Sequence, residues 1–285
     1  MRLVHLTDPH LTTPPGWRTL AGRSHCGKRY LGYASWARRR RHSLRRPWLV
    51  ELMREVEARS PDRLLITGDL TQIGTAEEIA EARAWLESLG DPERVSFVPG
   101  NHDTYADESW DALTREWRPW LPGDVSAFPT VQSNADVVVI GLSSCIPTWP
   151  FSACGLVGDA QLDRLEAVLE AERGRFRVLL LHHPPLPGMI SFRKRLKDAA
   201  GLARVLERRP VDLILHGHRH QNQKSDRDGT KVYCTAPASA EHASFRVFDV
   251  SRSDDGFAAE ASLVGRGPSG FEVRDIDAWS VSAPG

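Results

Sequence analysis

Five short hydrophobic segments constrain this chain most, because each of them runs directly into Asp, Asn or His. The central segment is 65–69, in which an apolar run closes on a glycine and then presents the carboxylate of Asp69. A short apolar run bounded by turn residues is typical of a parallel β-strand that is covered on both faces. The other four segments lead into Asp8-Pro9-His10, Gly100-Asn101-His102-Asp103, His182-His183-Pro184-Pro185 and Gly217-His218-Arg219-His220. Core packing does not require this pattern, so it predicts a functional site at the carboxyl ends of the strands.

The order of the expected elements is typical of an α/β fold. Apolar strands are expected at 3–7, 65–69, 94–98, 135–142, 178–182 and 213–216, and amphipathic helices at 47–59, 75–89, 159–173 and 198–208. The segments 104–134 and 143–158 are expected to be loops. We therefore expect two sheets that pack face to face and are flanked by helices, which is a four-layer α/β sandwich.

The chain changes character after about residue 230, where antiparallel strands are expected at 231–235, 244–250 and 257–263. The last fifteen or so residues have no expected element. With 285 residues, of which 41% are hydrophobic, the chain can bury a sizeable core. No linker rich in Pro, Gly or Ser divides it. We therefore expect one domain over 1–285, with an insertion at about 11–47 and a β-rich part from about 230.

Basic residues are concentrated in the expected insertion, although the whole chain has 37 Lys or Arg and 37 Asp or Glu. Ten Lys or Arg and no acidic residue lie between Asp8 and Glu51. The aromatic residues interleaved with them are Trp17, Tyr30, Tyr33, Trp36 and Trp48. Part of the insertion is expected to form an amphipathic helix with a basic face, from the spacing of Tyr30, Tyr33, Ala37 and Leu44.

The cysteines and the N-terminus bear on where the protein works. Cys26, Cys145, Cys154 and Cys234 show no C-x-x-C spacing, so we expect four free thiols in a reducing compartment. No signal-peptide pattern opens the chain, and no apolar run approaches the roughly 20 residues that cross a bilayer. We therefore expect a cytoplasmic protein, with peripheral binding to the inner membrane face as an alternative.

The polar residues at the strand ends form a donor set of oxygen and imidazole groups: Asp8, His10, Asp69, Asn101, His182, His218 and His220. This set contains no thiolate, suits Mn, Fe or Zn, and is too rich in nitrogen for Ca or Mg alone. Residues two apart on an extended backbone point to the same side, so Asp8 with His10 and His218 with His220 can converge. Asp69 is expected to bridge two cations, which at about 3.5–4 Å apart polarise a phosphoryl group and make hydroxide from a bridging water.

The motifs Asp-x-His, Gly-Asp, Gly-Asn-His-Asp, His-x-Pro and Gly-His-x-His, in this order and spacing, resemble the signature of the calcineurin-like metallophosphoesterase family. The resemblance extends from residue 1 to about 240. Its local contexts are most similar to the bacterial class III cyclic-nucleotide phosphodiesterases. It implies a dinuclear site with Asp8, His10, Asp69 and His220 on one metal and Asp69, Asn101, His182 and His218 on the other.

The resemblance also implies roles for residues that bind no metal. His102 would reach the scissile phosphate and stabilise charge or protonate the leaving oxygen, with Asp103 orienting its ring. His183 competes with His182 as a ligand, and the family pattern His-x-Pro selects His182. Gln72 departs from the family pattern, in which Asp often follows Gly-Asp-Leu-Thr.

The expected function is that of a dinuclear metal-dependent phosphoesterase, which hydrolyses a phosphodiester or pyrophosphate by attack of a metal-bound hydroxide. The insertion at 11–47 is a solvated surface, a cap that offers Arg to a substrate phosphate, or a dock for anionic lipid. The lipid interpretation resembles the UDP-diacylglucosamine pyrophosphatase branch of the family. A nuclease and a metal-free binding scaffold are further alternatives. Nucleic acid is the less favoured partner, because the rest of the chain is net negative.

Overall fold

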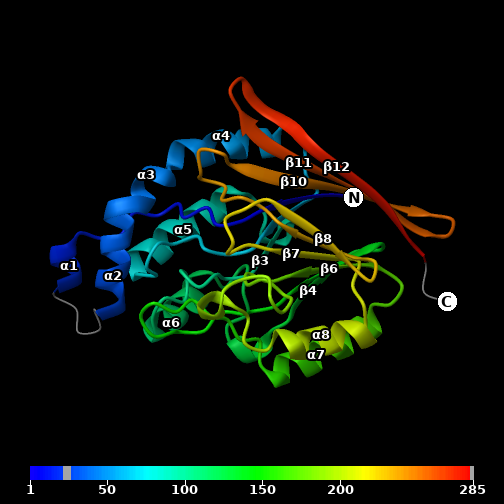
Figure 1. Cartoon of the computed structure of the whole chain (residues 1–285), viewed down its shortest axis with the longest axis horizontal. Coiled ribbons are helices and arrows are strands. Elements are labelled where there is room, and N and C mark those ends of the chain that lie inside the picture. Colours follow the sequence, from blue (N-terminus) through cyan, green and yellow to red (C-terminus); the bar gives the residue numbers. More distant parts are fainter. Residues whose placement is uncertain (22–26, 283–285) are drawn as a thin grey trace.

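The computed structural model describes residues 1–21 and 27–282, which form two six-stranded sheets packed face to face (Figure 1). The first sheet has the order β12 (Gly270–Ser282), β11 (Gly256–Gly267), β10 (Ser244–Ser253), β1 (Arg2–Leu6), β2 (Arg63–Ile66), β3 (Val95–Phe97). The second has the order β4 (Thr130–Ser133), β5 (Val137–Gly141), β6 (Phe176–Leu180), β7 (Leu213–His216), β9 (Thr230–Cys234), β8 (Gln223–Arg227). The predicted two-sheet α/β sandwich is confirmed.

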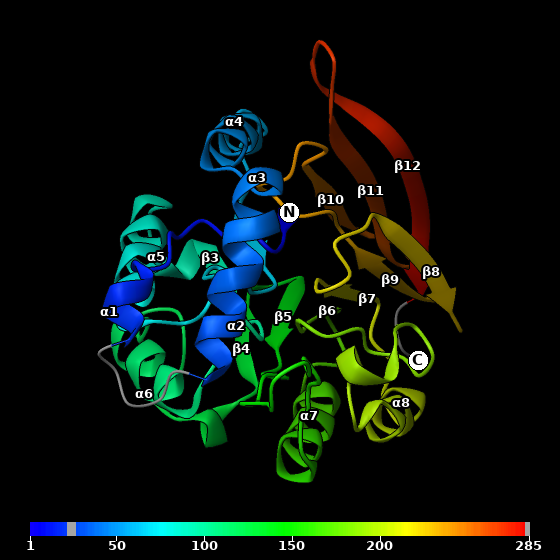
Figure 2. The same ribbon diagram turned by 60° about the vertical axis from the view of Figure 1, so that its left-hand side comes forward.

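Helices cover the outer face of each sheet, which completes four layers (Figures 1 and 2). The helices over the first sheet are α4 (Arg46–Glu57), α5 (Ala76–Ser88) and α6 (Asp107–Glu116), and those over the second are α7 (Asp159–Ala171) and α8 (Ala199–Arg208). Side chains such as Leu52 and Ile79 pack against Val4 on the first sheet. Their apolar spacing along the helix is what commits one face of each helix to the core.

The space between the sheets is filled by the apolar runs that define the strands. Leu3, Leu65 and Val178 are fully buried there with side chains from both sheets. The strands β1, β2 and β3 pair in parallel, as do β5, β6, β7 and β9. The carboxyl ends of parallel strands lie at one edge of a sheet, so residues that follow these strands are brought near one another.

Three regions differ from the sequence-based expectation. The strand expected at 231–235 as an antiparallel neighbour of 244–250 is β9, which lies in the second sheet, parallel to β7 and antiparallel to the unexpected β8. The segment 104–134, expected as a loop, contains α6 and β4, and Trp117 at the end of α6 is fully buried with its indole N–H on the carbonyl of Ile79 at 2.9 Å. The C-terminal residues without an expected element form β12, a long edge strand paired with β11. Its side chains alternate between partly covered and exposed, so the strand is held mainly by backbone pairing with a neighbour.

The insertion forms a helical rod, seen in Figure 2 as α2 and α3 in sequence. Its parts are α1 (Trp17–Ala21), α2 (Gly27–Ser35), a π-helical turn (Trp36–Arg40) and α3 (Arg41–Ser43). The expected helix therefore exists, but Leu44 lies just beyond it and bridges to Ala240. Arg23 and Cys26 lie outside the described residues. Cys145, Cys154 and Cys234 are buried free thiols. None of the described helices combines the length and the apolar character needed to cross a bilayer.

Candidate metal centre

The side chains predicted as metal ligands come from the carboxyl ends of five strands in both sheets. Asp8 and His10 follow β1, Asp69 follows β2, Asn101 follows β3, His182 follows β6, and His218 and His220 follow β7. The structure brings all seven to one place, in two groups that share Asp69. Each group is built from more than one strand, so the site exists only in the folded chain.

The backbone at this site adopts conformations that L-residues rarely use. The residues with positive φ are Asp8 (51°), His10 (40°), Asp69 (58°), His218 (68°) and His220 (55°). Such conformations cost about 1–3 kcal/mol each and persist where surrounding contacts over-determine them. Main-chain hydrogen bonds supply those contacts, since the amides of Asp8 and His10 donate to the carbonyls of Gly68 and Asp69 at 3.1 and 2.9 Å.

Glycine is required where one strand end approaches another. A Cβ on Gly100 would lie 2.1 Å from Asp69 Oδ1, and a Cβ on Gly217 would lie 2.0 Å from Thr7 Oγ1. Any larger residue would push the ligand-bearing turns apart. The glycines of the Gly-Asn-His-Asp and Gly-His-x-His motifs are therefore explained by packing at the site.

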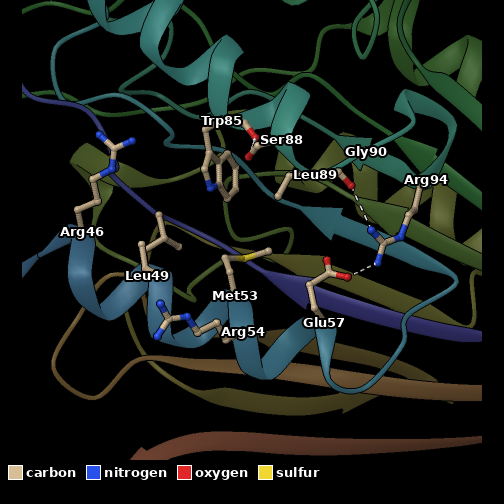
Figure 3. Close-up of a pocket in the computed structure, with 11 residues that line it drawn as sticks. Arg46, Leu49, Met53, Arg54, Glu57, Trp85, Ser88, Leu89, Gly90 and Arg94 are labelled. Atoms are coloured by element: carbon tan, nitrogen blue, oxygen red, sulfur yellow. Dashed lines mark hydrogen bonds and ion pairs between the residues drawn. The ribbon is translucent and has the colours of Figure 1, made fainter.

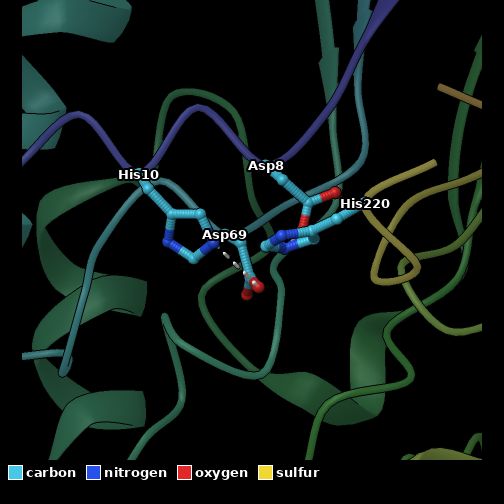
Figure 4. Close-up of side chains that lie close together, drawn as sticks. All are labelled: Asp8, His10, Asp69 and His220. Carbon is cyan, nitrogen blue, oxygen red and sulfur yellow. Dashed lines mark ion pairs between the residues drawn. The ribbon is translucent and has the colours of Figure 1, made fainter. Parts of the chain in front are cut away.

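The first group contains Asp8, His10, Asp69 and His220. One donor atom from each of them lies within 4.8 Å of the others (Figure 4). His220 Nε2 lies 3.1 Å from Asp8 Oδ1, and His10 Nε2 lies 3.7 Å from Asp69 Oδ2. Figure 4 shows the four side chains pointing toward one another, as ligands of one cation would.

The second group is centred on His182. Its Nε2 lies 3.1 Å from Asn101 Oδ1, 3.2 Å from His218 Nδ1 and 3.4 Å from Asp69 Oδ2. The same Asp69 oxygen therefore faces His10 in the first group and His182 in the second. A carboxylate in this position can contribute to two adjacent cation sites.

Main-chain carbonyls set the orientation of two of these rings. His10 Nδ1 lies 2.9 Å from the carbonyl of Thr71, and His182 Nδ1 lies 2.7 Å from the carbonyl of Thr67. A carbonyl can only accept, so in each ring Nδ1 carries the proton and Nε2 keeps its lone pair. Ligating histidines in metalloproteins commonly have this arrangement.

The donor atoms have the unpaired character that a metal site requires. Among the described residues, His10 Nε2 and His218 Nε2 are buried and have no hydrogen-bond partner, and buried Asp8 Oδ1 faces His220 Nε2, itself a candidate ligand, at 3.1 Å. Buried polar atoms are almost always paired, because leaving one unpaired costs about 1–3 kcal/mol. Two unpaired ring nitrogens in one cluster with a buried carboxylate oxygen, all of kinds that bind divalent transition metals, fit a pair of bound cations.

The pKa shifts of the buried carboxylates in the cluster also favour a bound cation. Burial raises the pKa of Asp69 well above its usual range, and the neighbouring carboxylates of Asp8 and Asp103 add to this effect. Burial also acts to raise the pKa of Asp8, but the histidines around it, His220 first, outweigh burial and hold that pKa well below its usual range. A buried carboxylate that is difficult to ionise is stabilised in its charged form by a nearby cation.

His102 lies beside the cluster, but its surroundings differ from the expectation. Its Nδ1 lies 2.6 Å from the carbonyl of Gln72 and so carries the proton, which leaves Nε2, 3.1 Å from Arg40 Nη1, as the nitrogen that can accept from Arg40. Burial, followed by the charge of Arg40, holds the pKa of His102 well below its ordinary value. The ring is therefore positioned by Gln72 and by Arg40 of the insertion. Asp103 was expected to orient this ring, but its described hydrogen bonds go to main-chain amides instead.

Asp103 instead organises the backbone of the ligand-bearing turns. Its carboxylate accepts hydrogen bonds from the amides of Asp69 at 2.9 Å, Thr71 at 2.9 Å and Gly100 at 2.8 Å. Burial raises the pKa of Asp103 to about 6, against the effect of these hydrogen bonds. Asp103 thus fixes the turn that presents Asp69 and the turn that presents Asn101.

His183, the alternative to His182 as a ligand, and Gln72, which departs from the family pattern, both make defined hydrogen bonds. His183 Nδ1 lies 2.8 Å from Ser144 Oγ and its Nε2 lies 3.1 Å from the carbonyl of Ala153, so it ties neighbouring loops together. Gln72 donates from Nε2 to the carbonyl of His10 at 2.7 Å. It therefore supports the backbone of a ligand rather than the ligand ring itself.

Arg40 is the site residue that the sequence did not single out. It was one of four consecutive arginines, and nothing local distinguishes it from its neighbours. In the structure it reaches the ring of His102 and lines a cavity of about 820 Å³ together with Asp69, His218 and His220. The cap interpretation of the insertion gave the only signal, because it placed an unspecified Arg near the metals.

A second cavity, of about 730 Å³, lies between α4 and α5, away from the cluster (Figure 3). Leu49, Met53 and Trp85 line it, and the Arg94 guanidinium pairs there with Glu57 at 2.8 Å and with the carbonyl of Leu89. Among the described residues that line it there is no histidine or cysteine, and the carboxylate of Glu57 is already paired with Arg94. The metal centre is therefore the better candidate for chemistry.

Comparison with known proteins agrees with this geometry. Residues 1–222 match the family model described as calcineurin-like phosphoesterase. A probable cyclic nucleotide phosphodiesterase from Rhodococcus erythropolis is 32% identical over 179 residues, which cover 60% of this chain and 56% of that protein. A probable cyclic nucleotide phosphodiesterase from Synechococcus is 30% identical over 199 residues, which cover 68% of this chain and 71% of that protein. The match thus spans little more than half of the Rhodococcus protein.

Among solved structures, a dimetal phosphatase from Danio rerio superposes on 95% of this chain with a TM-score of 0.62, covering 98% of that chain. The sequence identity is 14%, so this likeness concerns the fold. The family model ends before β8, and the C-terminal strands β10 to β12 lie outside the matched residues.

Proposed function

Since the chain belongs to the calcineurin-like phosphoesterase family, we propose that it is a metal-dependent hydrolase that cleaves a phosphodiester or a pyrophosphate. The observation that carries the proposal is the position of Asp69 Oδ2, 3.7 Å from His10 Nε2 and 3.4 Å from His182 Nε2. A carboxylate shared between two sets of ligands is the arrangement that holds two divalent cations side by side.

The residues that would hold the cations follow from the two groups. Asp8, His10, Asp69 and His220 would hold one, and Asp69, Asn101, His182 and His218 the other. Oxygen and imidazole donors without a thiolate suit Mn, Fe or Zn. When bound, such a pair supplies Lewis acidity toward a phosphoryl oxygen and lowers the pKa of a water molecule.

Two residues beside the proposed metal ligands, His102 and Arg40, would act on the substrate. The His102 ring lies beside His10, with ring centroids 4.9 Å apart, so a phosphate at the cluster is within its reach. The negative charge of a bound phosphate would favour the protonated ring, from which His102 would donate a hydrogen bond to the phosphate or protonate the leaving oxygen. Arg40, next to that ring, would offset negative charge that builds on the phosphate during the reaction.

Cyclic nucleotides, after which two of the relatives are named, are the first candidate substrates within this class. We expect protein reconstituted with Mn²⁺ to hydrolyse bis(p-nitrophenyl) phosphate, to lose that activity with EDTA, and to regain it when Mn²⁺ returns. The same assay would compare cyclic nucleotides, a nucleotide-sugar lipid pyrophosphate and single-stranded DNA. Metal content is measured in parallel by mass spectrometry of the digested protein.

Two results would contradict the proposal. Hydrolysis that EDTA leaves unchanged would remove the metals from the reaction. Less than one equivalent of metal after growth and purification with Mn²⁺, together with no turnover of any substrate, would instead favour the metal-free binding scaffold.

A second candidate is a pyrophosphatase that works in the cytoplasm at the inner membrane face on a lipid-linked substrate. The observation that favours it is an aromatic rim of Trp149, Phe151 and Phe192, whose side chains are 87%, 77% and 71% exposed. Arg193 and Lys194 follow Phe192 directly, and Phe151 lines the cavity at the metal centre. Exposed aromatic rings beside basic residues are typical of surfaces that bind the membrane interface.

For this candidate we expect the protein to sediment with liposomes that contain anionic lipid, and to be released by high salt. Replacing Trp149 and Phe151 by Ser would abolish sedimentation, while replacing the distant exposed Val273 by Ser would leave it intact. Wild-type protein that stays in the supernatant at low salt would eliminate the membrane candidate and leave the soluble hydrolase.

A further inference from the structure

We propose that the cavity at the metal centre binds substrates with a second phosphate besides the one that is cleaved, and that Arg38 and Arg39 hold that second phosphate. The inference rests on the proposed function and narrows its substrate class. It distinguishes this chain from a phosphodiesterase whose substrate has no negative charge other than that of the scissile phosphodiester.

The cavity at the metal centre is strongly cationic. Its cationic lining residues are Lys28, Arg38, Arg39, Arg40, Arg193, Lys194 and Arg219. Among the described residues that line it, Asp69 is the one acid, and Asp69 belongs to the metal site. Positive charge concentrated in a concave site attracts and retains anions, because the surrounding protein focuses the field.

The arginines of the insertion differ in the partners that they have. Arg29 pairs with Glu108, and Arg46 pairs with Glu81 at 2.7 Å, so these two attach the insertion to the rest of the fold. Arg38 and Arg39 are exposed at the cavity, and within residues 1–21 and 27–282 no ion pair engages them. Unlike the first two, they are left available for a ligand.

Arg40 is less exposed than Arg38 and Arg39. It reaches inward to His102, its Nε is buried without a hydrogen-bond partner, and none of the described carboxylates forms an ion pair with it. The side chain is half-buried and its Nη groups donate to the carbonyls of Gln72 and Gly32, so its charge has neutral partners only. An anion that arrives with the substrate would supply the missing counter-charge. Arg40 lies beside His102, so the anion it meets is the scissile phosphate.

The local backbone geometry brings three consecutive arginines to one cavity. Arg38, Arg39 and Arg40 are consecutive and all line the same cavity, although successive side chains of an α-helix point about 100° apart. They belong to a π-helical turn, Trp36–Arg40. Single π-turns inside helices are rare and occur often at functional sites. Here the turn accompanies the presentation of three guanidinium groups to one ligand.

The number of cationic groups in the cavity can be compared with the negative charge of each candidate substrate. A cyclic mononucleotide has one negative charge, on the phosphate that the metal centre, His102 and Arg40 would contact. Arg38 and Arg39 would then have no counterpart in the substrate. A phosphate monoester carries about two negative charges and three acceptor oxygens, which suits the paired donors of two guanidinium groups.

The test uses two pairs of matched ligands and the full chain loaded with Mn²⁺. Binding is measured by titration calorimetry with thymidine 5′-monophosphate and with thymidine 3′,5′-bisphosphate. Turnover is measured with the p-nitrophenyl ester of the 5′-phosphate, with and without the additional 3′-phosphate. We expect the bisphosphate to bind roughly tenfold more tightly, and the ester with the additional phosphate to have a correspondingly lower KM.

The variant Arg38→Gln/Arg39→Gln should remove that preference and leave binding of the monophosphate unchanged. The matched control is Arg18→Gln/Arg41→Gln, which removes the same charge from the insertion at two exposed residues outside the cavity lining. It should keep the preference. Equal binding of both nucleotides by the wild-type protein, or loss of preference in the control variant, would overturn the inference.

The two readouts separate this inference from the proposed function. Tighter binding of the bisphosphate that depends on Arg38 and Arg39 supports the second-phosphate site even if neither ester is cleaved, in which case the proposed function is the part that fails. Turnover of both esters without a binding preference supports the hydrolase and rejects the second-phosphate site.

Discussion

Asp69→Asn is expected to empty at least one of the two metal positions and to lower phosphodiester turnover by about 10³-fold or more. The size of this decrease in turnover follows from the loss of a Lewis acid that contributes several kcal/mol to stabilising the transition state. The amide of Asn presents one oxygen and no charge, whereas Asp69 Oδ2 faces ligands of both groups. The substitution keeps the size of the side chain, so the effect isolates charge and coordination from packing.

The measurement is metal stoichiometry alongside the rate with bis(p-nitrophenyl) phosphate. Asp212→Asn is the matched control, because Asp212 is also a buried carboxylate with a pKa raised by burial. It lies just before β7 and accepts from the Arg177 amide at 2.6 Å, at the end of the strand opposite to the metal centre. If Asp69→Asn retained two equivalents of metal, Asp69 would not be the shared ligand.

The candidate ligands were predictable because each lies within a few residues of a hydrophobic strand. Strand β1, for example, is recognisable from apolar residues alone, and Asp8 and His10 follow it directly. Sheet geometry then requires the carboxyl ends of parallel strands to meet. Local sequence pattern and sheet topology were therefore sufficient to select the candidate ligands. The two-sheet sandwich and the family assignment are both confirmed.

The contact between Arg40 and His102 was not predictable in this way. It joins residues 62 positions apart and depends on the path of the insertion and on a π-helical turn. Helical periodicity cannot identify which of four consecutive arginines faces a cavity, because one additional residue in a turn rotates every side chain that follows. Sequence reasoning therefore found a basic insertion but not its contact.

Two misses in the fold have different causes. In α6 a signal was present, since Trp110, Leu113 and Trp117 recur at helical spacing and pack on one core. β12 gave no such signal, because an edge strand exposes part of each face, and residues such as Ile276 are 59% exposed. Its formation depends on backbone pairing with β11, which residue patterns do not record.

Asp103 illustrates a role that a motif can misassign. A carboxylate next to a catalytic histidine suggests that it orients the ring, as the resemblance implied. In the fold, the buried amides of Asp69, Thr71 and Gly100 need an acceptor, and Asp103 supplies it. The demand of buried backbone groups thus decides the role of this side chain.

His102→Ala is expected to lower turnover by about 10²–10⁴-fold while both metals stay bound. The metal site should survive because the amide of residue 102, which donates to Asp69 Oδ1 at 2.8 Å, belongs to the main chain and remains in the variant. His242→Ala, at an exposed loop histidine, is the matched control and should keep the wild-type rate.

The choice of substrate shows how His102 acts. A p-nitrophenolate leaves readily without a proton, whereas the alkoxide released from a cyclic nucleotide needs one. If His102 protonates the leaving oxygen, His102→Ala should impair hydrolysis of the cyclic nucleotide much more than that of bis(p-nitrophenyl) phosphate. If it only stabilises charge on the phosphate, both rates should fall by a similar factor. A variant with full metal content and near-normal rates on both substrates would remove His102 from the mechanism, and Arg40 would then be the remaining group at that position.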